Sequence, residues 1–272
     1  MKDFHGKVAV ITGAGSGIGR SLALQLSKLG ADLALGDINL ENLSLTRDML
    51  EKSNQVSLHR VDVAEREQMA GFAREVIAEH GHVDILINNA GITLTPTIFE
   101  DIPEVDFERV MHVNMWGVYY GIREFLPHLQ TRPEAVIVNM SSLAGLVGLY
   151  GYSPYAMSKF AIRGLTEALQ SELAGTNISL LIVHPGGVKT NIIKNAPDLA
   201  NDQQRQDAHL EFSRFALLDP ETVAAKIISA VRNNKRQLVI GIDARIVNMI
   251  RAMFPGRFPG ILKTIFSQAR FK

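Results

Sequence analysis

The sequence lacks cysteine altogether in its 272 residues. This absence excludes a disulfide framework, a thiolate metal site, an iron–sulfur cluster and a cysteine nucleophile. A net charge is also lacking, since 28 basic residues balance 28 acidic ones, and a neutral chain is a poor partner for nucleic acid. No stretch of about eighteen uncharged apolar residues occurs, so we expect no membrane-spanning helix.

The first residues carry no secretory signal. A basic start is followed by only about six apolar residues before the glycines begin, so we expect a cytoplasmic protein. His80 and His82 flank Gly81 at an expected helix end and resemble a metal pair. Because no third ligand is nearby, we interpret them as solvated turn residues and expect no metal site.

The neutral total hides an uneven distribution of charge. Six basic residues and no acidic residue follow Asp243, which leaves 22 basic against 28 acidic residues up to that point. The chain therefore divides into an acidic body, residues 1–243, and a basic, apolar tail, residues 244–272.

Apolar runs and helical patterns alternate through the body. Short apolar runs typical of buried strands lie at 8–12, 32–36, 56–61, 83–88, 135–141, 178–184 and 237–241. Segments with helical spacing lie between them, at 17–29, 40–53, 65–80, 106–129, 155–174 and near 221–233. This alternation predicts a single α/β domain of the doubly wound Rossmann type, with a parallel seven-stranded sheet and helices on both faces.

Two segments fall outside this alternation. Residues 189–219 are polar and show no strand, and a structureless insert of that length is typically functional, so we expect a substrate lid there. In the tail, apolar residues recur at helical spacing, and Pro255 and Pro259 interrupt them. We expect two short helices there, which either lie on a membrane surface as a basic, apolar anchor or pack on the pocket or a partner subunit.

A glycine-rich turn joins the first expected strand to the first expected helix. It reads T-G-x-x-x-G-x-G, with Gly13, Gly17 and Gly19 at the fixed places and Ser16 and Ile18 between them. Such a turn lets a phosphate group approach backbone N–H groups at the positive end of a helix. Its place within the first strand–helix–strand unit indicates a dinucleotide site.

Asp37 ends the second expected strand, eighteen residues after Gly19. A carboxylate at this place accepts hydrogen bonds from both ribose hydroxyls of adenosine and repels a 2′-phosphate. The residues that follow supply no arginine to pair with such a phosphate, although Arg20 is nearby. The sequence therefore favours NAD over NADP as the cofactor.

Tyr155 and Lys159 are four residues apart and share one face of an expected helix. A phenol has an ordinary pKa of about 10 and is a poor base at neutral pH, whereas a neighbouring ammonium group favours the phenolate and lowers that pKa. A Tyr–Lys pair alone is common by chance. Here Ser142 and Asn114 accompany it, at the carboxyl end of a strand and on a facing helix, where doubly wound sheets bind ligands.

In these motifs the chain resembles the short-chain dehydrogenase/reductase family over residues 5–243. The resemblance includes the glycine-rich turn, an adenine-contacting pair, an N-N-A-G run, an active-site asparagine, a catalytic serine–tyrosine–lysine set and a nicotinamide-side motif. In the same order, these are residues 13–19, Asp62 and Val63, Asn88 with Asn89, Ala90 and Gly91, Asn114, Ser142 with Tyr155 and Lys159, and Pro185 with Gly186, Val188 and Thr190.

The resemblance implies an NAD-dependent interconversion of an alcohol and a ketone. It implies that Tyr155 exchanges a proton with the substrate oxygen and that Ser142 donates a hydrogen bond to that oxygen. Lys159 would lower the tyrosine pKa and hold the nicotinamide ribose, and Asn114 would keep a water that connects Lys159 to solvent. The family also implies a homodimer or a homotetramer.

The residues around the expected pocket are mainly apolar, so we expect a small hydrophobic alcohol or ketone as the substrate. They include Leu143, Leu146, Leu149 and Tyr150 beside the catalytic serine and Ile193, Phe212 and Leu217 in the lid. Two other functions remain open. One is an epimerase or dehydratase that retains NAD. The other is a nucleotide-sensing scaffold without turnover, which would be expected to have lost Tyr155 or Lys159.

Overall fold

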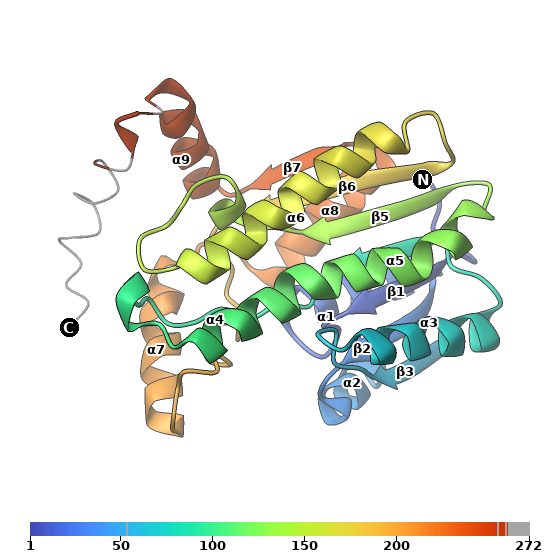
Figure 1. The fold of residues 1–272 in the computed structure, drawn as a ribbon. Helices are drawn as coiled ribbons and strands as arrows, with labels where there is room; N and C mark the ends of the chain where they lie inside the picture. Colours follow the sequence, from blue (N-terminus) through green and yellow to red (C-terminus); the bar gives the residue numbers. More distant parts are fainter. Residues whose placement is uncertain (53, 255, 259, 261–272) are drawn as a thin grey trace.

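A single parallel sheet organises the protein. The structure, a computed structural model, describes residues 1–52, 54–254, 256–258 and 260, and for Arg214 and Phe215 the backbone alone. Within this part of the chain, seven strands form one sheet in the order β3-β2-β1-β4-β5-β6-β7, and helices cover both of its faces (Figure 1). The predicted doubly wound α/β sheet is confirmed.

The strands lie close to their expected places. They are β1 Val8–Thr12, β2 Asp32–Asp37, β3 Val56–Arg60, β4 Ile85–Asn88, β5 Ala135–Met140, β6 Ile178–Pro185 and β7 Gln237–Ile240. The strand order reverses where β1 pairs with β4. The carboxyl ends of these two strands therefore border the crevice in which such sheets bind ligands.

Nine helices and three short turns make up the rest of the described regular structure. The helices are α1 Gly17–Lys28, α2 Leu40–Arg47, α3 Arg66–His80, α4 Glu104–Met111, α5 Gly117–Gln130, α6 Ser153–Glu172, α7 Asp202–Phe215, α8 Pro220–Arg232 and α9 Ile242–Met253. The turns are η1 Phe99–Asp101, η2 His112–Trp116 and η3 Leu143–Gly145. None of the described helices is both long and apolar enough to cross a membrane.

Side-chain alternation along the strands builds a separate core on each face of the sheet. Ile11 of β1 packs with Leu22 of α1 and Ile227 of α8 in one core. Val10 packs with Phe72 of α3 and Phe125 of α5 in the other. With both faces covered, the strand residues are buried nearly throughout, which is why these strands are continuous apolar runs in the sequence.

Two expectations about the helices are wrong. The single helix expected at 106–129 is three elements, since the π-helical turn η2 separates α4 from α5. The segment 189–219 is not structureless, because it contains α7. Hydrophobic periodicity missed α7 because this helix is mainly polar, although Asn201 caps it by accepting a hydrogen bond from the Gln204 N–H.

The tail begins with a helix, as expected, and this helix packs on the body. Val247 and Ile250 of α9 join a small core with Leu146, Val147 and Phe258. In Figure 1, α9 and α7 lie at the end of the molecule toward which the strands point. The second expected tail helix falls outside the described residues.

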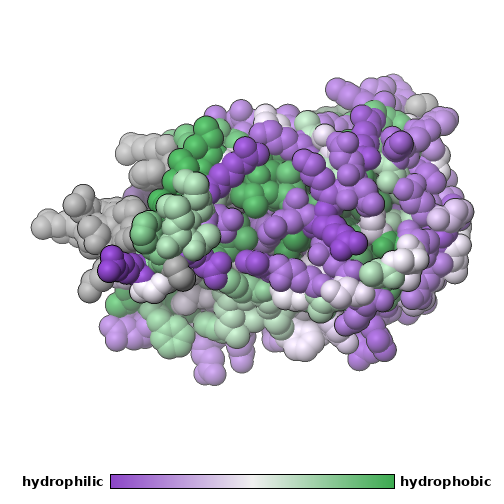
Figure 2. All heavy atoms as spheres, turned by 90° about the horizontal axis from the view of Figure 1, so that it is seen from above, coloured by the Kyte–Doolittle hydropathy of each residue, from purple (hydrophilic) through white to green (hydrophobic). Residues whose placement is uncertain are grey.

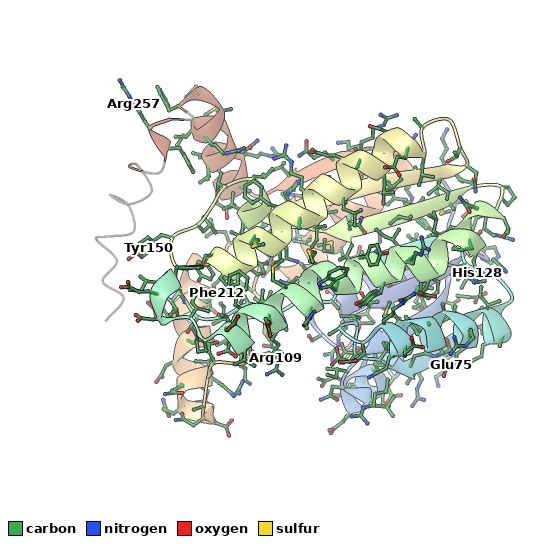
Figure 3. All side chains as sticks on the ribbon, in the orientation of Figure 1. Glu75, Arg109, His128, Tyr150, Phe212 and Arg257 are labelled. Atoms are coloured by element: carbon green, nitrogen blue, oxygen red, sulfur yellow. The ribbon has the colours of Figure 1, made fainter. Side chains whose placement is uncertain are left out.

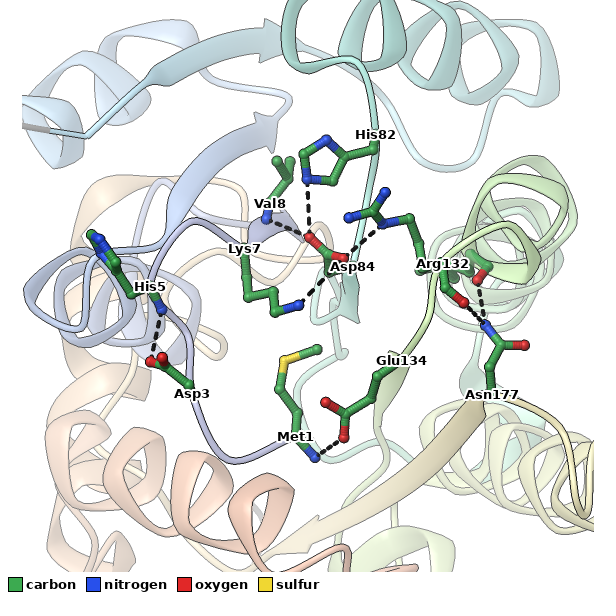
Figure 4. Close-up of polar contacts among 11 residues, drawn as sticks. Met1, Asp3, His5, Lys7, Val8, His82, Asp84, Arg132, Glu134 and Asn177 are labelled. Carbon is green, nitrogen blue, oxygen red and sulfur yellow. Dashed lines mark hydrogen bonds and ion pairs between the residues drawn. The ribbon is translucent and has the colours of Figure 1, made fainter.

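The opposite end of the sheet is held by a buried carboxylate (Figure 4). Asp84, just before β4, is fully buried and accepts a hydrogen bond from the Val8 N–H at 3.0 Å. It also forms ion pairs with Arg132 at 2.8 Å, His82 at 3.2 Å and Lys7 at 4.0 Å. These contacts tie the amino ends of β1 and β4 together.

His80 and His82 are not solvated turn residues, contrary to the expectation. His82 pairs with Asp84, and the Nε2 atom of His80 lies 2.8 Å from the Ser57 hydroxyl within the protein. The partner of His80 is 23 residues away in the sequence, so no local pattern could reveal it, whereas Asp84 is only two residues from His82.

Candidate active site

The glycine-rich turn packs against the loop that follows β4. Gly13 and Gly17 have φ angles of +66° and +52°, which favour glycine. A Cβ atom at Gly13 would lie 2.8 Å from the Ala90 Cα, and one at Gly19 would overlap with the Gly13 carbonyl. Ser16 is the N-cap of α1, and its side chain makes no capping hydrogen bond. The first N–H groups of α1 thus suit a phosphate group.

Thr12 ties this turn to the N-N-A-G run. Its hydroxyl accepts hydrogen bonds from the N–H groups of Asn89 at 3.1 Å and Ala90 at 3.2 Å. In return, the Asn89 side chain donates to the carbonyls of Thr12 at 2.9 Å and Gly13 at 3.1 Å. Asn89 and Ala90 therefore lie where predicted. Thr12 was missed as a site residue, although its place directly before Gly13 was a usable signal.

Asp37 faces the same turn from the end of β2. Its Oδ2 atom accepts a hydrogen bond from the Gly15 N–H at 2.9 Å. Arg20 donates from Nε to the Thr46 hydroxyl at 2.9 Å and from Nη2 to the Gly15 carbonyl. These contacts engage Arg20 on the protein itself, so the arginine that directly follows the glycine-rich turn is not presented to a 2′-phosphate.

A pocket beside Asp37 fits the predicted adenine end. Ile38, Arg60, Asp62 and Gln68 line it. Of these, only Asp62 was predicted. The signal for Arg60 was its place at the end of β3, opposite Asp37 in the strand register. The other member of the predicted adenine pair, Val63, is buried beneath this surface.

The catalytic candidates come together at the carboxyl end of β5. Ser142 caps η3, with its hydroxyl accepting a hydrogen bond from the Ala144 N–H at 3.1 Å. The Ser142 side chain lies close enough to the Tyr155 hydroxyl to favour its ionised form. The Lys159 ammonium group lies 5.5 Å from the centre of the Tyr155 ring and donates to the Met140 carbonyl at 3.0 Å.

Burial governs the protonation of these groups. It raises the pKa of the Tyr155 hydroxyl above its ordinary value of 10.0, and the nearby Ser142 side chain acts against this rise. Burial also lowers the pKa of Lys159 to about 8. The expected lowering of the tyrosine pKa is therefore not found in this structure, because desolvation penalises the phenolate and the ammonium group alike.

Tyr152 is a second phenol beside Tyr155. Burial, followed by the nearby charges of Tyr155 and Glu211, raises the pKa of Tyr152 to about 12. Tyr152 has no lysine four residues further along the chain, so it lacks the neighbouring ammonium group that Tyr155 has in Lys159.

Asn114 is placed by the π-helical turn. Its side chain accepts a hydrogen bond from the Ile92 N–H at 2.8 Å and donates to the Ile92 carbonyl at 2.9 Å and to the Ser158 hydroxyl at 3.0 Å. A Cβ atom at Gly91 would lie 3.2 Å from Asn114 Oδ1 and 3.3 Å from the Lys159 Nζ. A side chain at position 91 would therefore crowd both the Asn114 amide and the Lys159 ammonium group.

The nicotinamide-side motif follows β6. Pro185 ends the strand, and the Gly186 N–H donates to the Ile240 carbonyl at 2.8 Å. Val188 forms a β-bridge with Leu218, just before α8. A Cβ atom at Gly17 would lie 3.1 Å from a methyl group of Thr190, so this motif returns to the glycine-rich turn.

Residues 189–219, the predicted lid, contact the loop that follows β4. Thr95, in the loop after β4, donates through its N–H at 3.0 Å and through its hydroxyl to the Asp198 carboxylate. Arg205 of α7 donates to the carbonyls of Lys194 at 2.9 Å and Leu199 at 2.7 Å. Figure 3 shows Tyr150 and Phe212 at this end of the molecule, on the loop before α6 and on α7.

Part of the predicted apolar lining lies behind the pocket rather than in it. Leu146 and Val147 are fully buried against α9 and Phe258. Leu217 is mostly exposed, and Tyr150 is exposed as well. Leu143 and Leu149 are half-buried and remain suited to contact a substrate.

Known proteins resemble this chain over most of its length. A family model described as short chain dehydrogenase matches residues 7–200. The putative oxidoreductase SadH of Mycobacterium tuberculosis is 42% identical over 254 residues, which are 92% of this chain and 91% of that protein. The 3-oxoacyl-(acyl-carrier-protein) reductase FabG of Thermotoga maritima is 34% identical over 247 residues, 89% of this chain and 98% of the relative.

A solved structure shares the fold of this chain. A short-chain dehydrogenase/reductase from Burkholderia phymatum, solved in complex with NAD, matches with a TM-score of 0.85 and 30% sequence identity, covering 94% of this chain and 96% of that one. The chain belongs to the short-chain dehydrogenase/reductase family of oxidoreductases.

Proposed function

We propose that the protein is an NAD-dependent oxidoreductase that interconverts a hydrophobic secondary alcohol and its ketone. The observation that carries this proposal is the convergence of Tyr155, Ser142 and Lys159 at the sheet end that also presents the glycine-rich turn. The NAD complex of the Burkholderia relative supports the cofactor. The name of the Thermotoga relative, a 3-oxoacyl reductase, supports a ketone on an apolar chain.

Tyr155 and Ser142 handle the substrate oxygen. Tyr155 accepts the alcohol proton in the oxidative direction and returns it to the carbonyl oxygen in the reductive direction. The Ser142 hydroxyl, which lies near the Tyr155 hydroxyl, donates a hydrogen bond to the same oxygen and stabilises its developing charge. When bound, NAD supplies the hydride chemistry, accepting a hydride from the alcohol carbon or, in its reduced form, giving one to the carbonyl carbon.

Lys159 and Asn114 assist the transfer of protons between Tyr155 and solvent. Lys159, with a pKa lowered to about 8, exchanges protons readily near neutral pH. Gly91 lies between the side chains of Lys159 and Asn114 and crowds neither of them, and Asn114 would hold the water that the family resemblance implies. Residues 13–19, Asp37, Asp62, the N-N-A-G run and residues 185–190 would hold the cofactor.

Asp37 favours NAD over NADP. Its carboxylate ends β2 beside the adenine pocket, and Arg20 is engaged elsewhere. We expect a higher kcat/KM with NADH than with NADPH, and Asp37→Asn should narrow the difference because it removes the charge that repels a 2′-phosphate. A preference of the unaltered protein for NADPH would overturn this assignment.

Tyr155→Phe tests the chemistry. It keeps the ring and removes the exchangeable proton, so kcat with the best substrate from a panel of secondary alcohols and ketones should fall by about 100-fold or more, while NADH binding persists. Near-normal turnover by this variant would contradict the mechanism. Conversion of substrate without net NADH formation would instead indicate an epimerase or dehydratase, and cofactor binding without any turnover would indicate a sensing scaffold.

We also propose that the tail touches an anionic membrane surface. Four apolar residues, Ile242, Ile246, Met249 and Met253, are exposed on α9. The acidic residue of α9, Asp243, is turned toward the Gly187 N–H inside the protein, whereas Arg245 is exposed. The exposed charge beside these apolar residues is therefore basic. An exposed apolar stripe flanked by arginines complements anionic lipid, which attracts both features.

Vesicle binding tests this contact with a matched pair of variants. Met249 on α9 is 54% exposed and Met49 beyond α2 is 55% exposed. The protein should sediment with phosphatidylserine-containing vesicles but not with phosphatidylcholine vesicles. Met249→Glu should abolish this and Met49→Glu should not. No vesicle binding, or a Met249-dependent dimer in solution instead, would overturn the lipid assignment.

A homodimer or homotetramer remains part of the proposal. Trp116 and Tyr119 of the η2–α5 region and Met157 of α6 are exposed large apolar side chains, which suit burial against a second subunit. Light scattering during size-exclusion chromatography measures the mass directly, and a monomer would contradict this expectation.

A further inference from the structure

One carboxylate of the tail helix reaches the loop assigned to the nicotinamide end of the cofactor. Asp243 lies in the first turn of α9. Its Oδ2 atom accepts a hydrogen bond from the Gly187 N–H at 2.9 Å. Gly187 directly follows Pro185 and Gly186, which belong to the nicotinamide-side motif.

This contact requires glycine at two positions. A Cβ atom added at Gly186 would overlap with both oxygens of the Asp243 carboxylate, and one added at Gly241 would overlap with Oδ1. The carboxylate thus lies directly against the main chain of the loop. The Asp243 carboxylate therefore excludes a side chain at position 186, independently of any contact that Gly186 makes with the cofactor.

The same loop is held on two other sides. The Gly186 N–H donates to the Ile240 carbonyl of β7 at 2.8 Å, and the Gly187 carbonyl accepts from the Leu218 N–H at 3.1 Å. Asp243 supplies the remaining restraint, on the Gly187 N–H. Strand β7, the end of the lid and the first turn of α9 together fix the path of the chain toward Thr190.

The second oxygen of Asp243 gives an independent indication. Oδ1 is buried and has no hydrogen-bond partner among the described residues. A buried acceptor without a donor is destabilising, so a carboxylate at this position does not serve stability best. A site that keeps such a group is a candidate for a functional constraint.

We propose that Asp243 is a positioning residue for NAD, which holds the Gly186–Gly187 segment in the conformation that receives the nicotinamide end of the cofactor. This inference rests on the proposed function. It makes α9 a part of the active site, whereas the charge distribution alone marks Asp243 as the end of the catalytic body.

Two ligands distinguish this role from a general structural one. NADH occupies the whole site, whereas ADP-ribose lacks only the nicotinamide ring and tests the remainder of the cofactor site. Asp243→Ala should weaken NADH binding about tenfold or more, from loss of a charge-assisted hydrogen bond, and leave ADP-ribose binding unchanged. Asp243→Asn should largely restore NADH binding, because its amide oxygen still accepts from Gly187.

Asp202 supplies the matched control. It lies in the first turn of α7, as Asp243 does in α9, but it is exposed. Asp202→Ala should leave the affinities for both ligands unchanged. Equal losses for NADH and ADP-ribose in Asp243→Ala, or no loss for either, would overturn the inference. If the unaltered protein binds neither ligand, the proposed cofactor itself fails.

A double mutant tests the contact directly. Gly186→Ala alone should weaken NADH binding strongly, because the new methyl group collides with the Asp243 carboxylate. In the Asp243→Ala background the collision partner is gone, so the same methyl group should cost little. Additive losses in the two variants would show that the two positions act independently and would contradict the assigned role.

Discussion

Lys159 places an ammonium group in the interior of the protein. Its exposure is 3%, and burial lowers its pKa from 10.5 to about 8. Between these two values the unfolded chain binds more protons than the folded one. The unfolding free energy should therefore rise as the pH rises from 8 to 10.5, as the cost of burying the charge disappears.

Lys159→Met should stabilise the protein while it abolishes catalysis. We expect a gain of about 1–3 kcal/mol in unfolding free energy at pH 7 and a smaller rise between pH 8 and 10.5 than in the unaltered protein. Urea unfolding at a series of pH values measures both. Lys226→Met, at an exposed position of α8, should show neither effect. A Lys159→Met variant less stable at pH 7 would contradict this account.

His184 affects stability in the acidic range, between pH 6.5 and about 4. Its Nδ1 lies 3.0 Å from the Ser142 carbonyl, so Nδ1 carries the proton, and its buried Nε2 has no partner among the described residues. Burial lowers its pKa from 6.5 to about 4. The unfolded chain binds more protons between these values, so the unfolding free energy should fall as the pH falls from 6.5 to 4.

His184→Asn isolates this contribution. The asparagine amide can still donate to the Ser142 carbonyl but does not titrate, so the loss of stability between pH 6.5 and 4 should become smaller. Thermal unfolding across this range checks the prediction, with His5→Asn at an exposed position as the control. An unchanged pH dependence in His184→Asn would show that other groups cause the acid loss.

Among the elements, the predicted lid at residues 189–219 is joined to the body by hydrogen bonds between Thr95 and Asp198. Asp198 accepts two hydrogen bonds from Thr95, whereas the lid's own geometry is held by Arg205. A carboxylate that bonds across the entrance determines how often the lid opens, and lid opening often limits substrate entry or product release.

Asp198→Ala should therefore change kinetics more than stability. We expect KM for the carbonyl or alcohol substrate to rise about tenfold, from loss of a charge-assisted hydrogen bond, with KM for NADH little changed. Thr95→Val should have a similar but smaller effect, since its N–H remains. Asp207→Ala on exposed α7 surface serves as the control. Equal KM changes for substrate and NADH would argue against a lid contact.

Helices and strands whose apolar residues recur at regular spacing were predictable from the sequence. Elements that depend on single tertiary contacts were not. The strands and α1 follow from apolar runs and helical spacing. The π-helical turn depends on Asn114 bonding to the Ile92 main chain, and α7 has little apolar face to detect. Motif spacing located Asp37, Ser142, Tyr155 and Lys159. It could not locate Asp243 or Thr95, because their partners lie far away in the sequence.

On the scale of the whole molecule, the two ends of the sheet have different tasks. The carboxyl ends carry loops, lid and tail helix, whereas the amino ends are closed by the Asp84 contacts with Val8, Arg132, His82 and Lys7 (Figure 4). Figure 2 shows hydrophobic residues reaching the surface on the left side, where Figure 1 places α9. Stability and function are thus separated along the strand direction.

Asp84→Asn should test this separation. Removing the charge leaves its basic partners around a neutral buried side chain, which should lower the unfolding free energy by about 3 kcal/mol. NADH affinity and kcat, measured well below the unfolding temperature, should stay within about twofold of the unaltered protein, since the site is at the other end of the sheet. A large kinetic effect with little destabilisation would contradict this division.

The close fit between Gly186 and Asp243 also has an evolutionary consequence. Neither position is free to change first: a side chain at 186 collides with the carboxylate, and loss of the carboxylate releases the loop. We expect the two positions to be inherited as a pair, so that relatives with an acidic residue at 243 keep glycine at 186. Relatives that have lost the acid become free to carry alanine or serine there, and their C-terminal segments can then diverge in length and sequence.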